Sequence, residues 1–253
     1  MRHKDMRTAL VTGGAKRIGA SIVTDLAKNG FNVAIHAASS SEAADKLCDL
    51  ALQQGVKACA LSGDLTNSKE TREVFKRASD ALGPIDLLVN NASIFNADSV
   101  DEFEGQTWDT HFAIHLKAPA ILAAEMAQQS IKSGLIVNII DQRVKRLNPN
   151  FFSYTLSKSA LWTATQTMAQ GLAPKIRVNA IGPGPTLQNA RQDPSDFQKQ
   201  IDGLLLKRGP ELEEFGNTIR YFYETPSITG QIVMLDGGQH LAWETPDIAG
   251  IKE

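Results

Sequence analysis

The order of apolar and amphipathic segments constrains the fold of this chain more than any other feature. Short runs rich in Val, Ile and Leu, among them residues 7–12, 31–36 and 135–140, alternate with amphipathic stretches of a dozen residues or more. Unbroken apolar runs are typical of strands buried on both faces. Strands that alternate with helices favour a parallel sheet with right-handed crossovers. We therefore predict an α/β protein with a doubly wound parallel sheet of about seven strands and helices on both faces.

Glycines mark where several of the helices should end. Helices are expected over residues 18–29, 42–54 and 68–82, and each is followed by a glycine that can supply a left-handed C-terminal cap. The other predicted elements are helices over 107–132 (closed by Gly134), 153–172, 194–206 and 211–224, strands over 56–61, 85–90 and 175–181, and a last strand with its turn over 228–238. We expect a single domain over residues 1–253, with a polar, proline-rich lid at about 182–208.

Charge and composition argue against several classes of protein. A formal net charge of -2 gives no reason to expect a nucleic acid or an anionic membrane as partner, so a small-molecule substrate is expected. No apolar run approaches the roughly 18 residues of a membrane span, and the first strand has no signal-peptide core before it, which favours a cytoplasmic protein. Cys48 and Cys59 lack a CxxC pattern and histidines at ligand spacing. We interpret them as reduced packing residues and expect no metal site.

A glycine-rich turn follows the first predicted strand. Gly13, Gly14 and Gly19 lie where this strand ends and the first helix begins. Glycines at such a turn let the backbone approach a pyrophosphate, and the positive end of the helix dipole favours its charge. The turn therefore predicts a dinucleotide-binding site.

The end of the second predicted strand indicates which dinucleotide is bound. Folds of this kind place an acidic residue there to hold a ribose 2′-hydroxyl, whereas this chain has His36 followed by Ser39 and Ser40. Lys16 and Arg17 in the glycine turn face this position, and an arginine offers a bidentate fork to phosphate. These residues favour a 2′-phosphate, so NADPH is expected rather than NADH.

A tyrosine and a lysine lie one helical turn apart after the strand over 135–140. Tyr154 and Lys158 share a helix face, and Asp141 ends the preceding strand. An ammonium beside a phenol lowers the pKa of the phenol, as a general acid working near neutral pH requires. We predict a proton-handling cluster of Asp141, Tyr154 and Lys158.

These motifs together resemble the short-chain dehydrogenase/reductase family over nearly the whole chain. The resemblance implies a Rossmann-type fold in which Asp64-Leu65 meets the adenine, Asn90-Asn91-Ala92 follows the fourth strand and Pro183-Gly184 lies beside the nicotinamide. Tyr154 and Lys158 match the catalytic pair of the family. The expected cofactor-binding residues are Gly13, Lys16, Arg17, Ile18, Gly19, His36, Ser39, Ser40, Asp64, Leu65, Asn91, Ala92, Ser93, Lys158, Pro183 and Gly184.

Departures from the common family pattern resemble the pteridine reductases, particularly the bacterial dihydromonapterin/dihydrofolate reductase branch. Asp141 replaces the usual catalytic serine thirteen residues before Tyr154, and Phe95 supplies an aromatic ring after the fourth strand. The resemblance implies NADPH-dependent reduction of a pterin C=N bond, with Phe95 sandwiching the pterin against the nicotinamide. The residues expected to contact substrate are Arg17, Ser93, Phe95, Asp141 and Tyr154.

Three functions remain open on sequence alone. The first is pteridine reduction, and the second is carbonyl reduction of a 3-oxoacyl thioester or a sugar by the same fold. The third is a non-catalytic NADP(H)-binding regulator, for which loss of the Tyr154/Lys158 pair would be expected, although both residues are present. His115 stands where the wider family carries an asparagine of its proton relay, so its role is open. The resemblance also implies a homo-tetramer with the helices over 107–132 and 153–172 at an interface.

Overall fold

A single parallel sheet organises the molecule. The computed structural model describes residues 7–39, 41–188, 192–245 and 247–251. Its strands are β1 (Arg7–Val11), β2 (Phe31–Ala37), β3 (Ala58–Ser62), β4 (Leu87–Asn90), β5 (Gly134–Ile139), β6 (Ile176–Pro183) and β7 (Ile232–Leu235). They pair in the order β3-β2-β1-β4-β5-β6-β7, which confirms the predicted seven-stranded, doubly wound parallel sheet.

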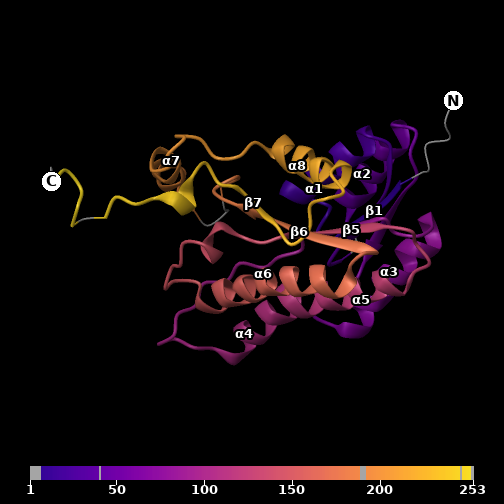
Figure 1. Cartoon of the computed structure of the whole chain (residues 1–253), viewed down its shortest axis with the longest axis horizontal. Coiled ribbons are helices and arrows are strands. Elements are labelled where there is room, and N and C mark those ends of the chain that lie inside the picture. The colour runs from indigo at the N-terminus through magenta and orange to yellow at the C-terminus, as the bar shows by residue number, and fades with distance from the viewer. Residues whose placement is uncertain (1–6, 40, 189–191, 246, 252–253) are drawn as a thin grey trace.

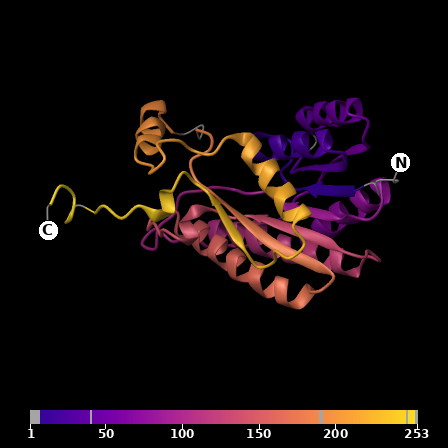
Figure 2. The ribbon, with the colours of Figure 1, turned by 45° about the horizontal axis from the view of Figure 1, so that its top comes forward.

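Helices cover both faces of the sheet (Figure 1). The helices α1 (Arg17–Lys28), α2 (Glu42–Gln53) and α8 (Leu212–Glu224) contribute to the apolar core on one face, and α3 (Ser68–Leu82), α5 (Ala118–Gln128) and α6 (Phe152–Leu172) to the core on the other. The short helix α4 (Gly105–Phe112) lies beside α6, and α7 (Pro194–Asp202) stands apart from both cores at one end of the molecule (Figure 2). The strand order reverses between β1 and β4, so the crevice beyond their carboxyl ends is where such folds bind ligands.

The long helix predicted over 107–132 is interrupted, so that prediction is wrong in detail. A π-helical turn η1 (Ala113–Lys117) separates α4 from α5, which ends at Gln128. A π turn adds one residue to a helical turn, and here it carries His115, whose side chain is buried. Gly134 does not cap a helix but begins β5, where a Cβ would lie 2.6 Å from the Met126 methyl group.

The segment expected to form a lid from about residue 182 includes the end of a strand. Gly182 and Pro183 are the last residues of β6 and pair with β7. They therefore belong to the sheet, and the segment that leaves it starts at Gly184. Helix α7, which follows in the chain, has no buried residue.

The cysteines and the helix lengths fit a packed globular protein. Cys48 on α2 and Cys59 on β3 are both free, and burial raises the pKa of the Cys48 thiol to about 11. In the described part of the chain, no helix combines the length and apolarity that crossing a membrane requires.

Candidate active site

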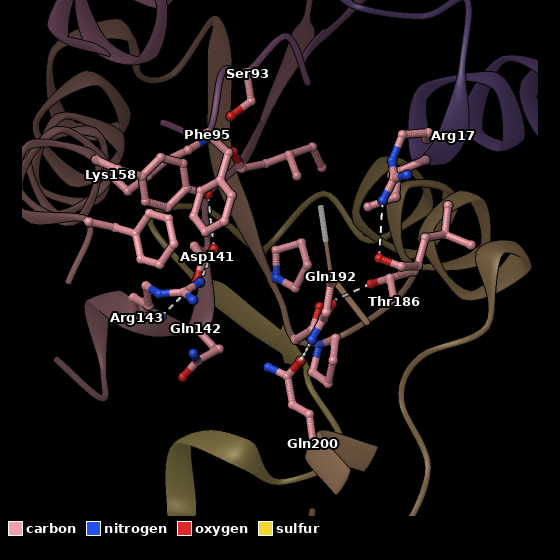
Figure 3. Close-up of a pocket in the computed structure, with 18 of the residues that line it drawn as sticks. Arg17, Ser93, Phe95, Asp141, Gln142, Arg143, Lys158, Thr186, Gln192 and Gln200 are labelled. Atoms are coloured by element: carbon pink, nitrogen blue, oxygen red, sulfur yellow. Dashed lines mark hydrogen bonds and ion pairs between the residues drawn. The ribbon is translucent and has the colours of Figure 1, made fainter. Parts of the chain in front are cut away.

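A cavity of about 1030 Å³ opens at the carboxyl ends of β4, β5 and β6 (Figure 3). Its walls come from the start of α1, the segment after β4, the segment from the end of β5 to α6, residues within 183–187 and 192–200, and Gln239. The predicted site residues that line it are Arg17, Ile18, Asn91, Ser93, Phe95, Asp141, Tyr154, Lys158, Pro183 and Gly184. The structure thus brings the predicted catalytic and substrate residues together in one cavity.

Asp141 and Tyr154 are in direct contact. The Tyr154 hydroxyl donates to Asp141 Oδ2 at 2.9 Å, while Asp141 Oδ1 accepts from the backbone N–H of Arg143 at 2.8 Å. The Arg143 guanidinium completes an ion pair with the same carboxylate at 3.2 Å, with only 18% of its side chain exposed. All three contacts donate to Asp141, which is the pattern of an ionised carboxylate.

Lys158 lies under Tyr154 and does not hydrogen-bond its hydroxyl. Its Nζ donates to the carbonyl oxygen of Ile139 at 2.9 Å and lies 5.8 Å from the centroid of the Tyr154 ring. Burial lowers the pKa of Lys158 to about 8, although the charge of Asp141 opposes this shift. The ammonium is therefore within the cluster and poised to lose its proton at mildly alkaline pH.

The expected lowering of the phenol pKa is wrong for this state of the protein. Burial raises the pKa of Tyr154 well above its ordinary value, and the adjacent Asp141 carboxylate raises it further. Arg143 acts in the opposite direction. Desolvation and the nearest negative charge outweigh a cation that lies under the ring, because both act directly on the hydroxyl.

Phe95 is stacked, but its stacking partner was not foreseen. Its ring lies parallel to Phe151, with centroids 4.2 Å apart, and edge-on to Tyr154 at 4.8 Å. The Arg143 guanidinium lies 5.1 Å from the Phe95 centroid and 5.3 Å from that of Phe151. One face of Phe95 is thus occupied by Phe151, where a sandwiched pterin had been expected.

Two histidines brace the segment that carries Ser93 and Phe95. His115 Nε2 accepts from the backbone N–H of Ile94 at 3.3 Å and lies 2.9 Å from Ser93 Oγ. His111 Nε2 likewise accepts from the N–H of Asn96 at 3.4 Å. On their other sides, Nδ1 of His115 meets Ser157 Oγ at 2.8 Å and Nδ1 of His111 meets Ser153 Oγ at 2.6 Å.

Both of these rings are neutral in this arrangement. Ser157 donates its proton to the carbonyl oxygen of Tyr154, so His115 must donate from Nδ1 and accept at Nε2. Burial lowers the pKa of His111, and lowers that of His115 well below its ordinary value. The rings stack on each other with centroids 5.5 Å apart, and both meet Tyr154 edge-on. His115 is therefore a support for the loop after β4 and for Tyr154.

The glycine turn is packed against the segment after β4. Asn91 Nδ2 donates to the carbonyl oxygens of Thr12 and Gly13 at 2.9 and 3.0 Å, and the N–H groups of Asn91 and Ala92 both donate to Thr12 Oγ1. A Cβ on Gly13, which has a φ of +60°, would lie 2.9 Å from Ala92 Cα. The glycines thus lie between β1 and α1, and the contacts with Asn91 and Ala92 hold the turn against the segment after β4.

His36 does not present a donor to a phosphate, which corrects the role predicted for it. The ring is 2% exposed. Its Nδ1 accepts from the N–H of Gly13 at 3.2 Å, and its Nε2 donates to the carbonyl oxygen of Gly63 at 2.9 Å. Burial lowers the pKa of His36, so it is neutral and joins the glycine turn to the end of β3.

Of the other residues predicted near a 2′-phosphate, Lys16 is exposed, whereas Arg17 is engaged elsewhere. Lys16 and Ser39 are exposed, and Ser40 lies outside the described residues. Arg17 reaches across the cavity instead, donating to the carbonyl oxygens of Leu187 and Gln188 at 3.1 and 3.2 Å (Figure 3). Arg17 thus ties the glycine turn to the segment after β6.

The Asp64-Leu65 pair forms a tight turn after β3. Both carboxylate oxygens of Asp64 accept from Thr66, one from its N–H and one from its hydroxyl, at 2.9 and 2.8 Å. Leu65 is buried. Gly19 is buried in the first turn of α1. The predicted residues that do not line the cavity are Gly13, Lys16, Gly19, His36, Ser39, Asp64, Leu65 and Ala92.

Several cavity residues were not predicted. Arg143 follows Asp141 by two positions and Phe151 precedes Tyr154 by three, so their closeness in sequence to predicted residues is a signal that could have identified them. Gln192 and Gln200 had no such signal, because only the fold of the segment after β6 brings them together, 3.2 Å apart. His111 and His115 are four residues apart, and so are Ser153 and Ser157, their hydrogen-bond partners on α6.

Comparisons with known proteins place this arrangement in a family. The model of the short chain dehydrogenase family matches residues 7–199. FolM alternative dihydrofolate reductase 1 from Brucella suis, crystallised in complex with NADP, is 57% identical with a TM-score of 0.93, covering 96% of this chain and 98% of its own. Two further relatives are 3-oxoacyl-[acyl-carrier-protein] reductase FabG of Staphylococcus epidermidis, 30% identical over 93% of this chain and 99% of its own, and L-xylulose reductase of Bos taurus, 34% identical over 92% and 96%.

The family match covers most of the chain, the sheet order and glycine turn agree with it, and Tyr154 and Lys158 lie together in the cavity at the carboxyl ends of the strands. The chain therefore belongs to the short-chain dehydrogenase/reductase family of oxidoreductases.

Proposed function

We propose that this protein is an NADPH-dependent reductase of a pterin-type C=N bond, converting a dihydropterin to a tetrahydropterin. The observation that carries the proposal is Asp141, a carboxylate hydrogen-bonded to Tyr154 where carbonyl-reducing relatives are expected to carry a serine. The Brucella neighbour, a dihydrofolate reductase by name and 57% identical, supports the same substrate class.

The glycine turn and the start of α1 fit a dinucleotide. No side chain caps the N-terminus of α1, so its backbone N–H groups are available to a pyrophosphate, and the glycines leave room for its approach. Lys16 and Arg17 flank this end of the helix and supply positive charge toward a 2′-phosphate. When bound, NADPH supplies the hydride for the reduction.

The residues of this chain would handle the proton. As hydride adds to the carbon of the C=N bond, the Tyr154 hydroxyl gives its proton to the nitrogen, and the electron pair of the O–H bond stays on the phenolate. Lys158 beneath the ring and Arg143 beside Asp141 stabilise that negative charge. Asp141, relieved of the tyrosine proton, accepts a hydrogen bond from the new N–H, and the ring of Phe95 in the cavity wall contacts the flat ligand.

Carbonyl reduction is the second candidate, favoured by the likeness to FabG and L-xylulose reductase. A hydroxyl at position 141 would donate a hydrogen bond to a carbonyl oxygen. The carboxylate of Asp141 repels a carbonyl oxygen. A substrate nitrogen that takes up a proton becomes an N–H group, which can donate a hydrogen bond to this carboxylate. The charge of Asp141 therefore separates the two candidates.

The test is steady-state turnover with NADPH and three substrates: a 7,8-dihydropterin, a 3-oxoacyl thioester and a ketose. We expect turnover of the dihydropterin, reduced at least 100-fold in Asp141→Ser and abolished in Tyr154→Phe, while both variants bind NADPH as the wild type does. Brisk thioester reduction without dihydropterin turnover, improved by Asp141→Ser, would establish the carbonyl reductase instead.

We also propose that the protein assembles as a homo-tetramer in the cytoplasm. Support comes from exposed apolar side chains near the α4 and α6 side of the molecule, including Val100, Phe103 and Leu156. Light scattering of the purified protein measures the mass directly.

A further inference from the structure

The helix that carries Tyr154 begins in a strained backbone conformation. Phe151, the N-cap residue of α6, has a φ of 64° and a ψ of 50°, which is the left-handed region. A Cβ makes this region costly, and a bulky residue is rarely found there. The phenyl side chain of Phe151 also makes no hydrogen bond to the free N–H groups of the first helical turn. The start of α6 therefore depends on groups from another part of the chain.

Asp98, in the segment after β4, supplies these groups. Its carbonyl oxygen accepts from the N–H of Phe151 at 2.8 Å and from that of Phe152 at 3.1 Å. Its carboxylate accepts from the N–H of Ser153, 55 positions further along the chain, with Oδ2 at 3.0 Å and Oδ1 at 3.2 Å. A carboxylate at this place also suits the positive end of the helix dipole. Three successive N–H groups at the start of α6 thus donate to one residue.

The turn that Asp98 binds places two parts of the active-site cavity. The ring of Phe151 lies on that of Phe95 with centroids 4.2 Å apart, and Tyr154 follows in the first turn of α6. Phe95 is itself three residues before Asp98. His111 joins the same two segments a second time through its two ring nitrogens. A shift of the backbone at Phe151 would therefore move both the aromatic wall and the proton donor.

We propose that Asp98 is a positioning residue for Tyr154. By binding three N–H groups it holds Phe151 in the left-handed conformation, and this fixes where α6 begins and where the Tyr154 hydroxyl meets Asp141. Asp98 does not line the cavity, so it acts through the residues that it holds. The inference rests on the proposed function only in taking Tyr154 as the proton donor, and it is the same for a pterin and for a carbonyl substrate.

The first test removes the carboxylate or keeps it as an acceptor, and measures kcat with whichever of the three substrates the wild type reduces. In Asp98→Ala the N–H of Ser153 loses its partner, so kcat should fall about tenfold at an unchanged Kd for NADPH. Asp98→Asn keeps an oxygen that accepts from the same N–H, so its kcat should stay within about twofold of the wild type. A normal kcat in Asp98→Ala, or an equal loss in Asp98→Asn, would overturn the inference.

Asp101→Ala is the matched control. Asp101 is an exposed aspartate in the same segment, and its carboxylate is hydrogen-bonded by Ser99 within that segment. Its kcat should equal that of the wild type. Each variant is assayed well below its melting temperature, so that a loss of kcat reports the placement of Tyr154 and not unfolding.

A second background tests whether Asp98 acts through the strained turn. Glycine adopts the left-handed region without a steric penalty, so in Phe151→Gly the turn no longer has to be held. Phe151→Gly should lower kcat by itself, because it removes a ring from the cavity wall. Adding Asp98→Ala to it should then lower kcat by only about twofold further, against the tenfold loss in the wild type. Equal losses in the two backgrounds would overturn the inference.

Amide hydrogen exchange tests the inference without a substrate. Asp98→Ala should speed exchange in a peptide covering residues 151–155 by about tenfold, whereas Asp101→Ala should leave it unchanged. Unchanged exchange in Asp98→Ala would overturn the inference even in an enzyme that reduces dihydropterins. Faster exchange in a protein that turns over no dihydropterin would support the role of Asp98 and refute the proposed function alone.

Discussion

The cofactor half and the substrate half of the site are built in different ways. Around the glycine turn each of these contacts has a main-chain group on at least one side: Gly14 N–H donates to the carbonyl of His36 at 2.8 Å, and the side chains of His36 and Asn91 meet main-chain N–H and carbonyl groups. On the substrate side the contacts are between side chains, as in the hydrogen bond from Tyr154 to Asp141 and the stack of Phe95 on Phe151.

This difference indicates which substitutions should affect cofactor binding and which should affect the choice of substrate. The cofactor half depends on the absence of side chains at a few glycines and on a few side chains, such as Asn91, that bind the main chain of the turn. A side-chain-built site depends on the identity of each partner, so single substitutions can change the substrate without disturbing the cofactor. Relatives named for dihydrofolate, 3-oxoacyl thioesters and xylulose share this chain's fold family.

The largest effect is expected from Gly19→Ala in the cofactor half. A Cβ there would overlap the Gly13 carbonyl oxygen and lie 2.7 Å from Asn91 Nδ2, so the turn itself must move. We expect NADPH affinity to fall about 100-fold, roughly 2.7 kcal/mol, measured by nucleotide fluorescence titration.

Gly105→Ala is the matched control for that variant. Gly105 begins α4, and an added Cβ meets no atom within 4 Å. Its affinity for NADPH should equal that of the wild type. A Gly19→Ala protein that binds NADPH normally would show that the turn tolerates side chains, and the proposed contrast between the two halves would fail.

The same contrast explains what the sequence could predict. The doubly wound parallel sheet, the glycine turn and the meeting of Asp141 with Tyr154 follow from periodicity and local spacing, which are properties of single segments. The neutral state of His36 was missed because it depends on the N–H of Gly13 and the carbonyl of Gly63, which come from two other segments.

Errors on the substrate side have a related cause. The direction of the pKa shift of Tyr154 depends on how deeply the ring is buried, and Phe151 reaches Phe95 only once the loops after β4 and β5 have folded together. The π turn at His115 could not be read from the apolar pattern, because one extra residue in a helical turn barely alters it. Packing between segments decides each of these features.

A medium effect should appear in the pH dependence, since Lys158 lies between the two halves. With its pKa lowered to about 8, the ammonium is lost as pH rises through 8, so kcat/KM should fall about tenfold per pH unit above that value. The effect of Lys158 on folding stability has the opposite sign. Between pH 8 and about 10.4 the unfolded chain keeps the lysine proton and the folded chain has lost it, so the free energy of unfolding rises with pH in this range. An alkaline limb that persists unchanged in an active Lys158→Arg variant would assign it to another group.

The smallest effect is expected from the two buried histidines, one in each half. The pKa values of His36 and His115 are both lowered, so the unfolded chain takes up their protons first as pH falls below about 6.5, and the stability that the neutral rings provide is lost in that direction. At pH 5.5 the wild type should melt a few degrees below its value at pH 7.5, and each His→Asn variant should show a smaller drop, at roughly 2–4 °C per kcal/mol.

The two histidine variants should also differ in their effects on substrate and cofactor binding. His115→Asn loosens the segment carrying Phe95 and should raise KM for the pterin about threefold at constant NADPH affinity, whereas His36→Asn loosens the glycine turn and should weaken NADPH binding at constant KM for the pterin. If both variants changed both constants equally, the two halves would be one coupled unit, because a loss of support on either side would then reach the other through the sheet.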